Sequence, residues 1–301
     1  MANAAKLISA SPARVLVTGY PGSAKTGSLA SLANAGFKLR VLDFDGNPES
    51  LLLFTNPECL KNIDIVSLED PITEQGRHLG TKMPTAFLQG LRLMDRWKYE
   101  DPDGVLDEKT GRLWVDLGSS KEWGLDTIVV LDGITGNSAA AMARARSLTN
   151  QTPENTTQQT WGMAAQDQLS FIKRLTASTN RHHVVALSHL KMVGPKDTTK
   201  GESEVSREIK ERMVDMIPTR LLPTAVGWSL PQQIAGEFPV AVNMEVRFKG
   251  NTAIRSMQVL PRKDMDLKVP ARDLEKLEGL GPETGLIELF KALGHKPPLE
   301  Q

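Results

Sequence analysis

The stretch RVLVTGYPGSAKTGSLASLANAG, residues 14–36, decides the predicted fold. It begins with a short β-branched and apolar run that ends in glycine, continues through a glycine-containing turn, and ends with an Ala- and Leu-rich run that stops at Gly36. Strand, loop and helix in this order are the context in which the pattern GxxxxGK(S/T) indicates a phosphate-binding loop. The pattern runs from Gly19 to Thr26, except that Ala24 stands where its last glycine belongs.

Each residue type in this loop has a physical role toward a nucleotide. Consecutive backbone N–H groups and a helix N-terminus converge on the β-phosphate, and the glycines allow the curl that this requires. Lys25 is expected to lie against the β- and γ-phosphates, and the Thr26 hydroxyl to take one coordination position on Mg²⁺. Ala24 adds a methyl group where the backbone approaches phosphate, which is expected to weaken affinity. The predicted nucleotide-binding residues are Gly19, Pro21, Gly22, Ser23, Ala24, Lys25, Thr26 and Gly27; an ordinary strand-to-helix turn is the alternative.

Acidic residues follow a second predicted strand. The run KLRVLDFDG, residues 38–46, carries Asp43 and Asp45 at its C-terminal end. Ligands of parallel sheets gather at the carboxyl ends of the strands. Asp45 is expected to orient or deprotonate an attacking water. The alternative is that these acids only serve the following turn and helix.

Two further buried strands end in polar residues. TIVVLD, residues 127–132, ends in Asp132, which has the form of the acid that holds the Mg²⁺ water shell in P-loop enzymes. HHVVALSHL, residues 182–190, is predicted to end near Ser188 and His189, and His189 is expected to sense the γ-phosphate. A helix N-cap and a structural histidine are the respective alternatives, whereas His182 and His183 at the opposite edge need no role.

Composition excludes several other classes of protein. The 301 residues carry 36 basic and 36 acidic side chains, so the formal net charge is zero and no overall positive field attracts nucleic acid. The single cysteine, Cys59, excludes an intrachain disulfide and a cysteine-based metal cluster. No apolar run is long enough for a secretion signal or a membrane span. A cytoplasmic protein without a membrane partner is therefore expected.

Together these motifs resemble the RecA-like core, and more closely the phage-encoded nucleotide-binding proteins of that core linked to single-strand annealing and recombination. The resemblance covers about residues 12–272 and includes a C-terminal pattern from LPQQIAGEF to MQVLPRKD. It implies an α/β fold with a mostly parallel central sheet, helices on both faces and an antiparallel C-terminal extension. Residues 1–272 would form the ATPase core, with an insertion at 71–124, and residues 273–301 a helical tail. Ala24 and the insertion depart from the family.

The resemblance also implies ATP and Mg²⁺, a bacterial host cytoplasm, oligomers of this chain, and single-stranded DNA as partners. In the family the loop after the strand that corresponds to residues 182–190 contacts DNA, which makes Lys191, Lys196 and Lys200 candidates; a solvated surface loop is the alternative. A better patch is the acid-free run 247–263, predicted to form an antiparallel pair with its basic side chains on one face. Arg247 and Lys249 could follow a phosphate backbone. Arg262 and Lys263 could reach a neighbouring subunit's γ-phosphate as a finger in trans, and Lys263 is the catalytic candidate. A charged edge that prevents aggregation is the alternative.

The insertion is expected to contain an amphipathic helix followed by a small β-hairpin. Its aromatic residues Trp97, Tyr99 and Trp114 could stack nucleic-acid bases or only pack the flap. The function predicted from all these features is DNA-stimulated ATP hydrolysis in recombination or replication. Two alternatives remain: a nucleotide-binding structural or virion-associated module without turnover, favoured by Ala24, and a phosphotransferase for a small acceptor, favoured if the insertion forms a lid.

Overall fold

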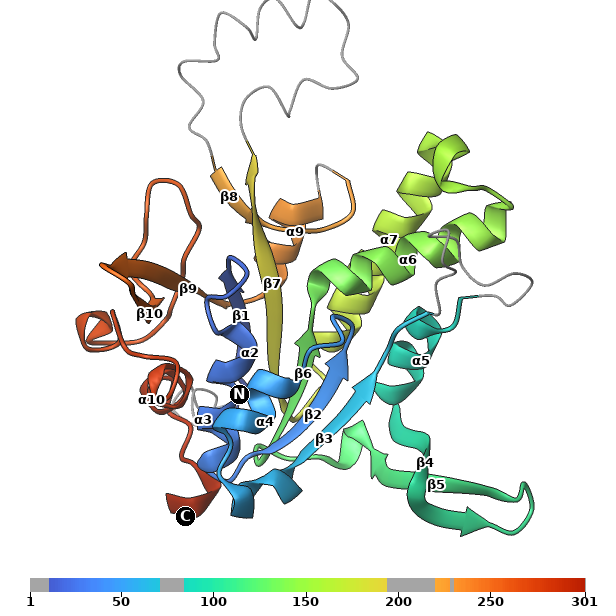
Figure 1. The fold of residues 1–301 in the computed structure, drawn as a ribbon, viewed down its shortest axis with the longest axis horizontal. Helices are drawn as coiled ribbons and strands as arrows, with labels where there is room; N and C mark the ends of the chain where they lie inside the picture. The colour runs from blue at the N-terminus through green and yellow to red at the C-terminus, as the bar shows by residue number, and fades with distance from the viewer. Residues whose placement is uncertain (1–10, 71–83, 194–219, 228–229, 301) are drawn as a thin grey trace, which may run out of the picture.

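The computed structural model describes residues 11–70, 84–193, 220–227 and 230–300. A central sheet has the strand order β10-β9-β1-β7-β6-β2-β3, with β8 paired to the end of β7 (Figure 1). Neighbouring strands from β9 to β3 run parallel, whereas β10 and β8 run antiparallel to their partners. The strands of this sheet are β1 (Arg14–Gly19), β2 (Lys38–Asp43), β3 (Ile63–Ser67), β6 (Thr127–Asp132), β7 (His183–Val193), β8 (Arg220–Pro223), β9 (Val240–Lys249) and β10 (Thr252–Gln258).

Helices cover both faces of the sheet because alternate residues of each buried strand point to opposite sides. Leu16 of β1 belongs to a core cluster that includes α5, α6, α7 and α9, whereas Val15 and Val17 belong to a cluster with α3, α4 and α10. The predicted fold class, including the antiparallel C-terminal extension, is confirmed. The helices are α2 (Lys25–Ser28), α3 (Ala30–Asn34), α4 (Glu49–Phe54), α5 (Ala86–Leu93), α6 (Ile134–Thr149), α7 (Gln158–Leu175), α9 (Leu230–Glu237) and α10 (Gly285–Ala292).

Strand register brings the sequence motifs together at one edge of the sheet. Strand β7 lies between β1 and β6, and Gly19 pairs with His189. On the other side of β6, Asp43 pairs with Asp132. The prediction that β7 ends near His189 was wrong, because β8 pairs with its continuation and extends it to Val193.

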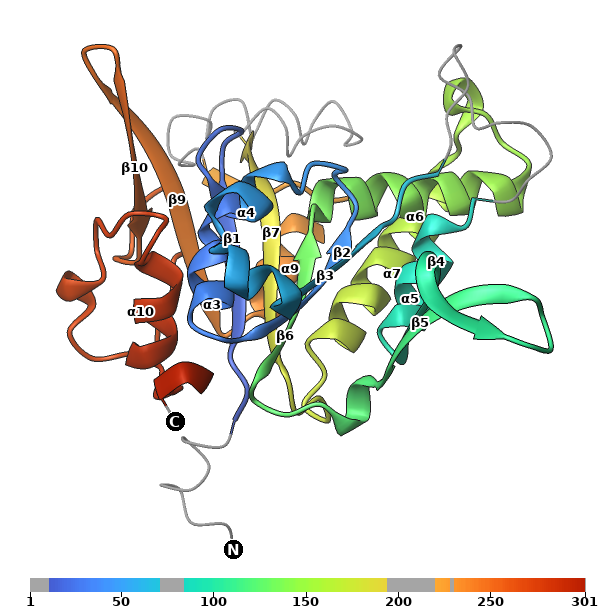
Figure 2. The same cartoon turned by 60° about the horizontal axis from the view of Figure 1, so that its bottom comes forward.

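The insertion forms α5 and a two-stranded hairpin of β4 (Arg96–Asp107) and β5 (Arg112–Ser119), as predicted. Figure 2 shows this hairpin and the β9–β10 hairpin projecting at opposite ends of the molecule. Trp97 is fully buried and donates its Nε1–H to Asp64 of β3 at 2.5 Å, and the Tyr99 hydroxyl donates to the same carboxylate at 3.1 Å. These two aromatic residues therefore fasten the hairpin to the sheet edge, and Trp97 presents no face on which a base could stack.

The C-terminal residues pack back onto the sheet. Leu286, Leu289 and Phe290 of α10 are fully buried in the cluster that also contains the strand residues of β1, and Phe290 contacts Phe37 edge to face with 5.6 Å between ring centroids. Before α10, the backbone of Met257 in β10 exchanges hydrogen bonds with Gly279 and Leu280. This segment thereby runs beside the β9–β10 hairpin and reaches the edge of the sheet where the motifs meet.

Candidate nucleotide-binding site

The loop from Gly19 to Thr26 connects β1 to α2 and has a geometry that fits phosphate. A Cβ at Gly19 would lie 2.5 Å from the Met244 carbonyl oxygen, so no larger residue fits there. Gly22 has a φ of 78° and open space where its side chain would be. The Oγ of the buried Ser23 has no hydrogen-bond partner among the residues that the structure describes. The open space at Gly22 leaves room for a phosphate group beside the loop backbone, whereas the buried Ser23 hydroxyl lies against Gly19.

Ala24 adopts a left-handed backbone conformation, with φ 67° and ψ 33°. This region costs a residue with a Cβ about 1–2 kcal/mol relative to right-handed helical geometry, whereas glycine adopts it readily. The sequence predicts an effect of Ala24 through its methyl group near phosphate. The structure adds a second reason for glycine at this position, which is the strain of the backbone itself.

Lys25 is held inside the loop by the loop's own carbonyl groups. Its Nζ donates to the carbonyl oxygens of Gly19 at 3.0 Å and Tyr20 at 3.2 Å, and it lies 3.3 Å from Nδ1 of His189. Burial lowers the pKa of Lys25 to about 8, against the opposing effect of nearby carboxylates. A bound polyphosphate would favour the charged form of this ammonium.

Thr26 and Asp132 form the part of the site that suits a divalent cation. The Thr26 hydroxyl donates to Oδ1 of Asp132 at 3.3 Å. Burial raises the pKa of Asp132 to about 7, the carboxylate of Asp45 adds to the shift, and the hydrogen bond from Thr26 opposes it. A hydroxyl beside a buried carboxylate is a donor set that Mg²⁺ accepts, and the cation's charge would favour the ionised carboxylate.

The two acids after β2 have different surroundings. Asp43 is buried and accepts the backbone N–H groups of Asp45 at 3.1 Å and Gly46 at 2.8 Å, so it closes the turn. Asp45 faces the pocket, with Oδ2 3.7 Å from Nε2 of His189. It packs over Gly133, where a Cβ would collide with its carboxylate. The turn-forming alternative therefore fits Asp43, whereas Asp45 is placed to meet a ligand.

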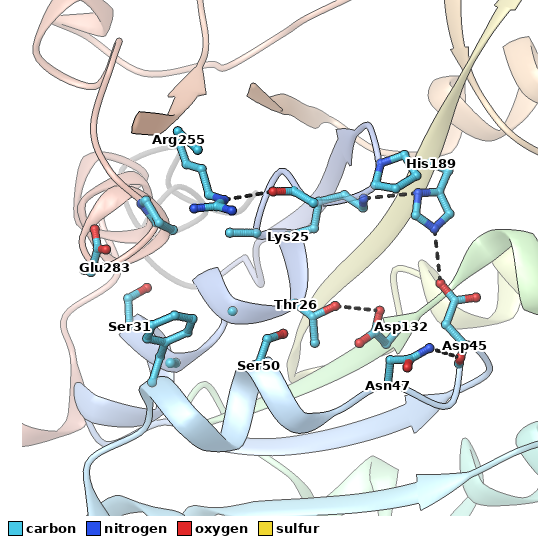
Figure 3. A pocket seen from close by; sticks show the side chains of 18 of the residues that line it. Lys25, Thr26, Ser31, Asp45, Asn47, Ser50, Asp132, His189, Arg255 and Glu283 are labelled. Atoms are coloured by element: carbon cyan, nitrogen blue, oxygen red, sulfur yellow. Dashed lines mark hydrogen bonds and ion pairs between the residues drawn. The ribbon is translucent and has the colours of Figure 1, made fainter. Parts of the chain in front are cut away.

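His189 links the lysine and the acid, since its two ring nitrogens face Lys25 and Asp45 (Figure 3). Burial and the neighbouring Lys25 lower the pKa of His189, against the opposing effect of Asp45. The imidazole is therefore mostly neutral near pH 7 and can donate one hydrogen bond and accept another.

One pocket of about 720 Å³ is lined by Lys25, Thr26, Asp45, Asp132 and His189, and its volume is within the size range of small-molecule sites. Its other end is built by residues that sequence reasoning missed, because they come from segments far apart in the chain and form no motif. Phe54 of α4, Arg255 of β10 and Glu283 before α10 are the main examples. Figure 3 shows Arg255 and Glu283 on the side of the pocket away from His189. The remaining lining residues outside the predicted set are Ala30, Ser31, Asn34, Asn47, Ser50, Ala253 and Pro282.

The basic C-terminal residues are not gathered as predicted. In the β9–β10 register Arg247 pairs with Ile254 and Arg255 with Val246, so Arg255 lies on the opposite face from Arg247 and Lys249. The prediction of one shared basic face was therefore wrong.

Acidic and amide side chains also engage two of the basic residues of this region. Glu245 forms ion pairs with Arg247 at 2.7 Å and Arg262 at 3.9 Å, and Arg262 also donates to Gln258. Lys263 is not among the residues that line the pocket.

The candidates after His189 are only partly covered by the described residues. Lys191 is exposed on β7, opposite Leu222 of β8. Lys196 and Lys200 lie outside the described residues.

No protein-family model and no curated protein matches the chain. Among solved structures, the chain is similar to flagellar accessory protein FlaH from Methanocaldococcus jannaschii, at 11% identity over 85% of this chain and 82% of that one, with a TM-score of 0.37. It is also similar to KaiC-like protein PH0186 from Pyrococcus horikoshii OT3, at 9% identity over 86% and 82%, with a TM-score of 0.36. Because both TM-scores lie below 0.5, neither likeness bears on function.

The class of protein follows from the chain's own topology and loop. Strand β7 is inserted between the strand before the loop 19–26 and the strand that ends in Asp132, within a mostly parallel sheet that helices cover on both faces, which defines an α/β protein. Its glycine-containing loop, Lys25 and the buried Asp132 form a site whose residue types fit a phosphate group and a divalent cation. Within the part of the chain that the structure describes, no helix has the length and apolar character needed to cross a membrane.

Proposed function

We propose that the protein binds Mg²⁺–ATP in this pocket and hydrolyses it. One observation carries the proposal: His189 lies 3.3 Å from Lys25 and 3.7 Å from Asp45, beside the Thr26–Asp132 pair, at the carboxyl ends of neighbouring parallel strands. This combination supplies a cation for phosphate, a ligand pair for Mg²⁺ and a carboxylate for water. A site that only orders a turn needs none of the three.

In the proposed reaction Lys25 exchanges its carbonyl partners for oxygens of the β- and γ-phosphates. Thr26 would be a ligand of Mg²⁺ and Asp132 would hold its water shell; when bound, the cation would neutralise part of the phosphate charge. Asp45 orients the attacking water and accepts its proton. The new bond joins the water oxygen to the γ-phosphorus, the bond from this phosphorus to the β–γ bridging oxygen breaks, and ADP carries that oxygen away. His189, which lies between Lys25 and Asp45, responds to the presence of the γ-phosphate.

The pocket also supports an orientation for the nucleotide. With the γ-phosphate near Asp45 and His189, the base extends toward Glu283, which Figure 3 shows on the far side of the pocket, and toward Phe54, which lines the same pocket. The Phe54 side chain is 53% exposed, so its ring can receive a base, and the Glu283 carboxylate can accept a hydrogen bond from an exocyclic amino group.

Single-stranded DNA and further copies of this chain are the partners in this proposal, in phage recombination, annealing or replication. Lys191, with Lys196 and Lys200, would contact DNA, and Arg247 and Lys249 on the exposed face of the β9–β10 hairpin are further candidates. Lys263 would act on a neighbouring subunit's nucleotide. The supporting observation is modest: Arg247 is 65% exposed in spite of its pairing with Glu245.

A nucleotide-binding module without turnover is the second candidate, and the left-handed Ala24 favours it, since a strained loop lowers the affinity for phosphate. The phosphotransferase alternative has less support. It required the insertion to act as a lid, and none of the described residues of α5 or the β4–β5 hairpin lines the pocket.

The test is a measurement of ATP binding, phosphate release and ADP formation by the purified protein, with and without single-stranded DNA. Hydrolysis that DNA accelerates supports the full proposal, and hydrolysis that DNA leaves unchanged removes DNA from it. ATP binding without phosphate release supports the second candidate. ADP formation that requires an added small acceptor supports the phosphotransferase.

A further inference from the structure

An arginine from the C-terminal hairpin reaches the phosphate-binding loop. Nε of Arg255 in β10 donates to the backbone carbonyl oxygen of Gly22 at 2.8 Å. Figure 3 shows its side chain pointing from the hairpin toward the loop, on the side of Lys25 away from His189. The two residues are 233 positions apart in the chain, and Arg255 lines the same pocket as Lys25.

The alternation of β10 explains why this arginine, and not its basic neighbours, reaches the site. Ala253 and Arg255 are two residues apart, so they share a face of the strand, and both line the pocket. Arg247 pairs with Ile254 on the opposite face. A shift of one residue in the register would turn Arg255 away from the loop.

Arg255 also differs from its neighbours in its partners. Arg247 and Arg262 both pair with Glu245, whereas the ion pairs among the described residues include none to Arg255. Its contact with Gly22 uses the Nε–H, and the four N–H donors on the two Nη atoms are left for another acceptor. A guanidinium beside a phosphate-binding loop, with no carboxylate paired to it, matches the geometry and charge of a phosphate group.

We propose that Arg255 is a second phosphate-binding cation of the site, supplied in cis, which donates to the polyphosphate of the nucleotide from the side opposite His189. The proposal rests on the proposed nucleotide function. Because Arg255 belongs to the β9–β10 hairpin, its contact also couples the order of this hairpin to the occupancy of the pocket. This role differs from that of Lys263, which was expected to act on a neighbouring subunit.

The experiment measures the affinities of wild type, Arg255→Ala and Arg255→Lys for ATP and for inorganic triphosphate, in the presence of Mg²⁺. A charge-assisted contact to phosphate predicts that Arg255→Ala weakens both ligands about 10- to 100-fold and that Arg255→Lys restores part of the loss. Triphosphate has no base or ribose, so a loss shared by both ligands localises the contact to phosphate. Arg112→Ala, on the β4–β5 hairpin that does not line the pocket, is the control and should bind both ligands like wild type.

Hydrogen exchange of the β9–β10 hairpin provides the second readout. ATP should slow exchange in β10 of the wild-type protein and have little effect on it in Arg255→Ala. If the wild type binds ATP, and Arg255→Ala binds both ATP and triphosphate as tightly as the wild type does, the inference is wrong and Arg255 only anchors the hairpin. If the wild type binds neither ligand, the proposed nucleotide function fails instead.

Discussion

Strand β7 carries one histidine near each of two edges of the sheet: the amino edge, where the parallel strands begin, and the carboxyl edge, where they end. The two histidines have opposite surroundings. His189, at the carboxyl edge, lies between Lys25 and Asp45 in an open pocket. His183, at the amino edge, is fully buried against the rings of Phe37, Phe290 and His295. The carboxyl edge thus holds polar groups whose partners can be exchanged for a ligand, whereas the amino edge holds a polar group inside the core.

This difference predicts two kinds of mutational effect. Substitutions at the carboxyl edge should remove function and leave the fold stable. Substitutions at the amino edge should change stability and leave the nucleotide site intact.

The largest effect is expected from Lys25→Ala, which should abolish ATP binding or turnover because the cation facing the β- and γ-phosphates is lost. The thermal unfolding midpoint should not fall, since burial already disfavours this ammonium in the free protein. Binding and phosphate release, together with thermal unfolding, check both parts. Unchanged hydrolysis by a folded variant would refute the P-loop assignment.

Asp45→Asn should slow turnover by about 10²–10⁴-fold, the usual contribution of a general base, and leave ATP binding largely intact. Asp43→Asn is the matched control. Its remaining amide oxygen can still accept the N–H groups of Asp45 and Gly46, so turnover should change little. If steady-state kinetics show the larger loss for Asp43→Asn, the two roles are reversed.

Phe54→Ala should weaken ATP binding about 5- to 30-fold and leave the maximal rate unchanged, because only stacking on the base is lost. Leu53→Ala is the control on the same helix, since Leu53 is 78% exposed and does not line the pocket. Titration with ATP and with inorganic triphosphate separates the base contact from the phosphate contacts. Equal losses for both ligands would place the base elsewhere.

At the amino edge, His183→Asn should reduce the loss of stability in acid. Burial lowers the pKa of His183 to about 3, and the neighbouring His295 adds to the shift. Below the ordinary pKa of about 6.5 the unfolded chain takes up a proton that the folded state refuses, so stability falls as the pH falls from 6.5 toward 3.

This one group accounts for about 2 kcal/mol between pH 7 and pH 5. Asparagine does not titrate there, and its Oδ1 can replace the ring Nδ1 that accepts the Ala13 N–H. Urea unfolding of both proteins at pH 7 and pH 5 measures how much unfolding free energy each protein loses between the two pH values. Equal losses for the two proteins would show that His183 is protonated in the folded state. A large change in the ATP affinity of His183→Asn at pH 7 would contradict the separation of the two edges.

The smallest effect is expected from Ala24→Gly. Removing the Cβ from a left-handed residue should raise the free energy of unfolding by about 0.5–1 kcal/mol and preserve or tighten ATP affinity. Chemical unfolding and ATP titration measure these two changes. A large loss of affinity would indicate that the loop has adapted to alanine.

The sequence predicts the fold and the polar half of the pocket because each contribution is local. Each predicted strand is directly followed in the chain by its functional residues, as β1 is by GYPGSAKT, or ends in one, as β6 does in Asp132. The parallel sheet then places these strand ends at one edge. The structure brings Lys25, Thr26, Asp45, Asp132 and His189 together at that edge.

The other half of the pocket was not predictable, for reasons of geometry. Phe54 and Glu283 come together only through packing of distant segments. Arg255 lies within the basic run 247–263, but the face of the strand that it occupies depends on a one-residue register that composition does not specify. The left-handed conformation of Ala24 is likewise a property of the closed loop, and a motif comparison shows only that a glycine is absent.

The most direct test of the account is a parallel measurement of Mg²⁺–ATP binding and phosphate release by wild type and Lys25→Ala. The account predicts that wild type binds ATP and releases phosphate only with Mg²⁺, and that Lys25→Ala does neither while remaining folded. Tight ATP binding by wild type without phosphate release, with or without single-stranded DNA, would contradict it and leave a nucleotide-binding module without turnover.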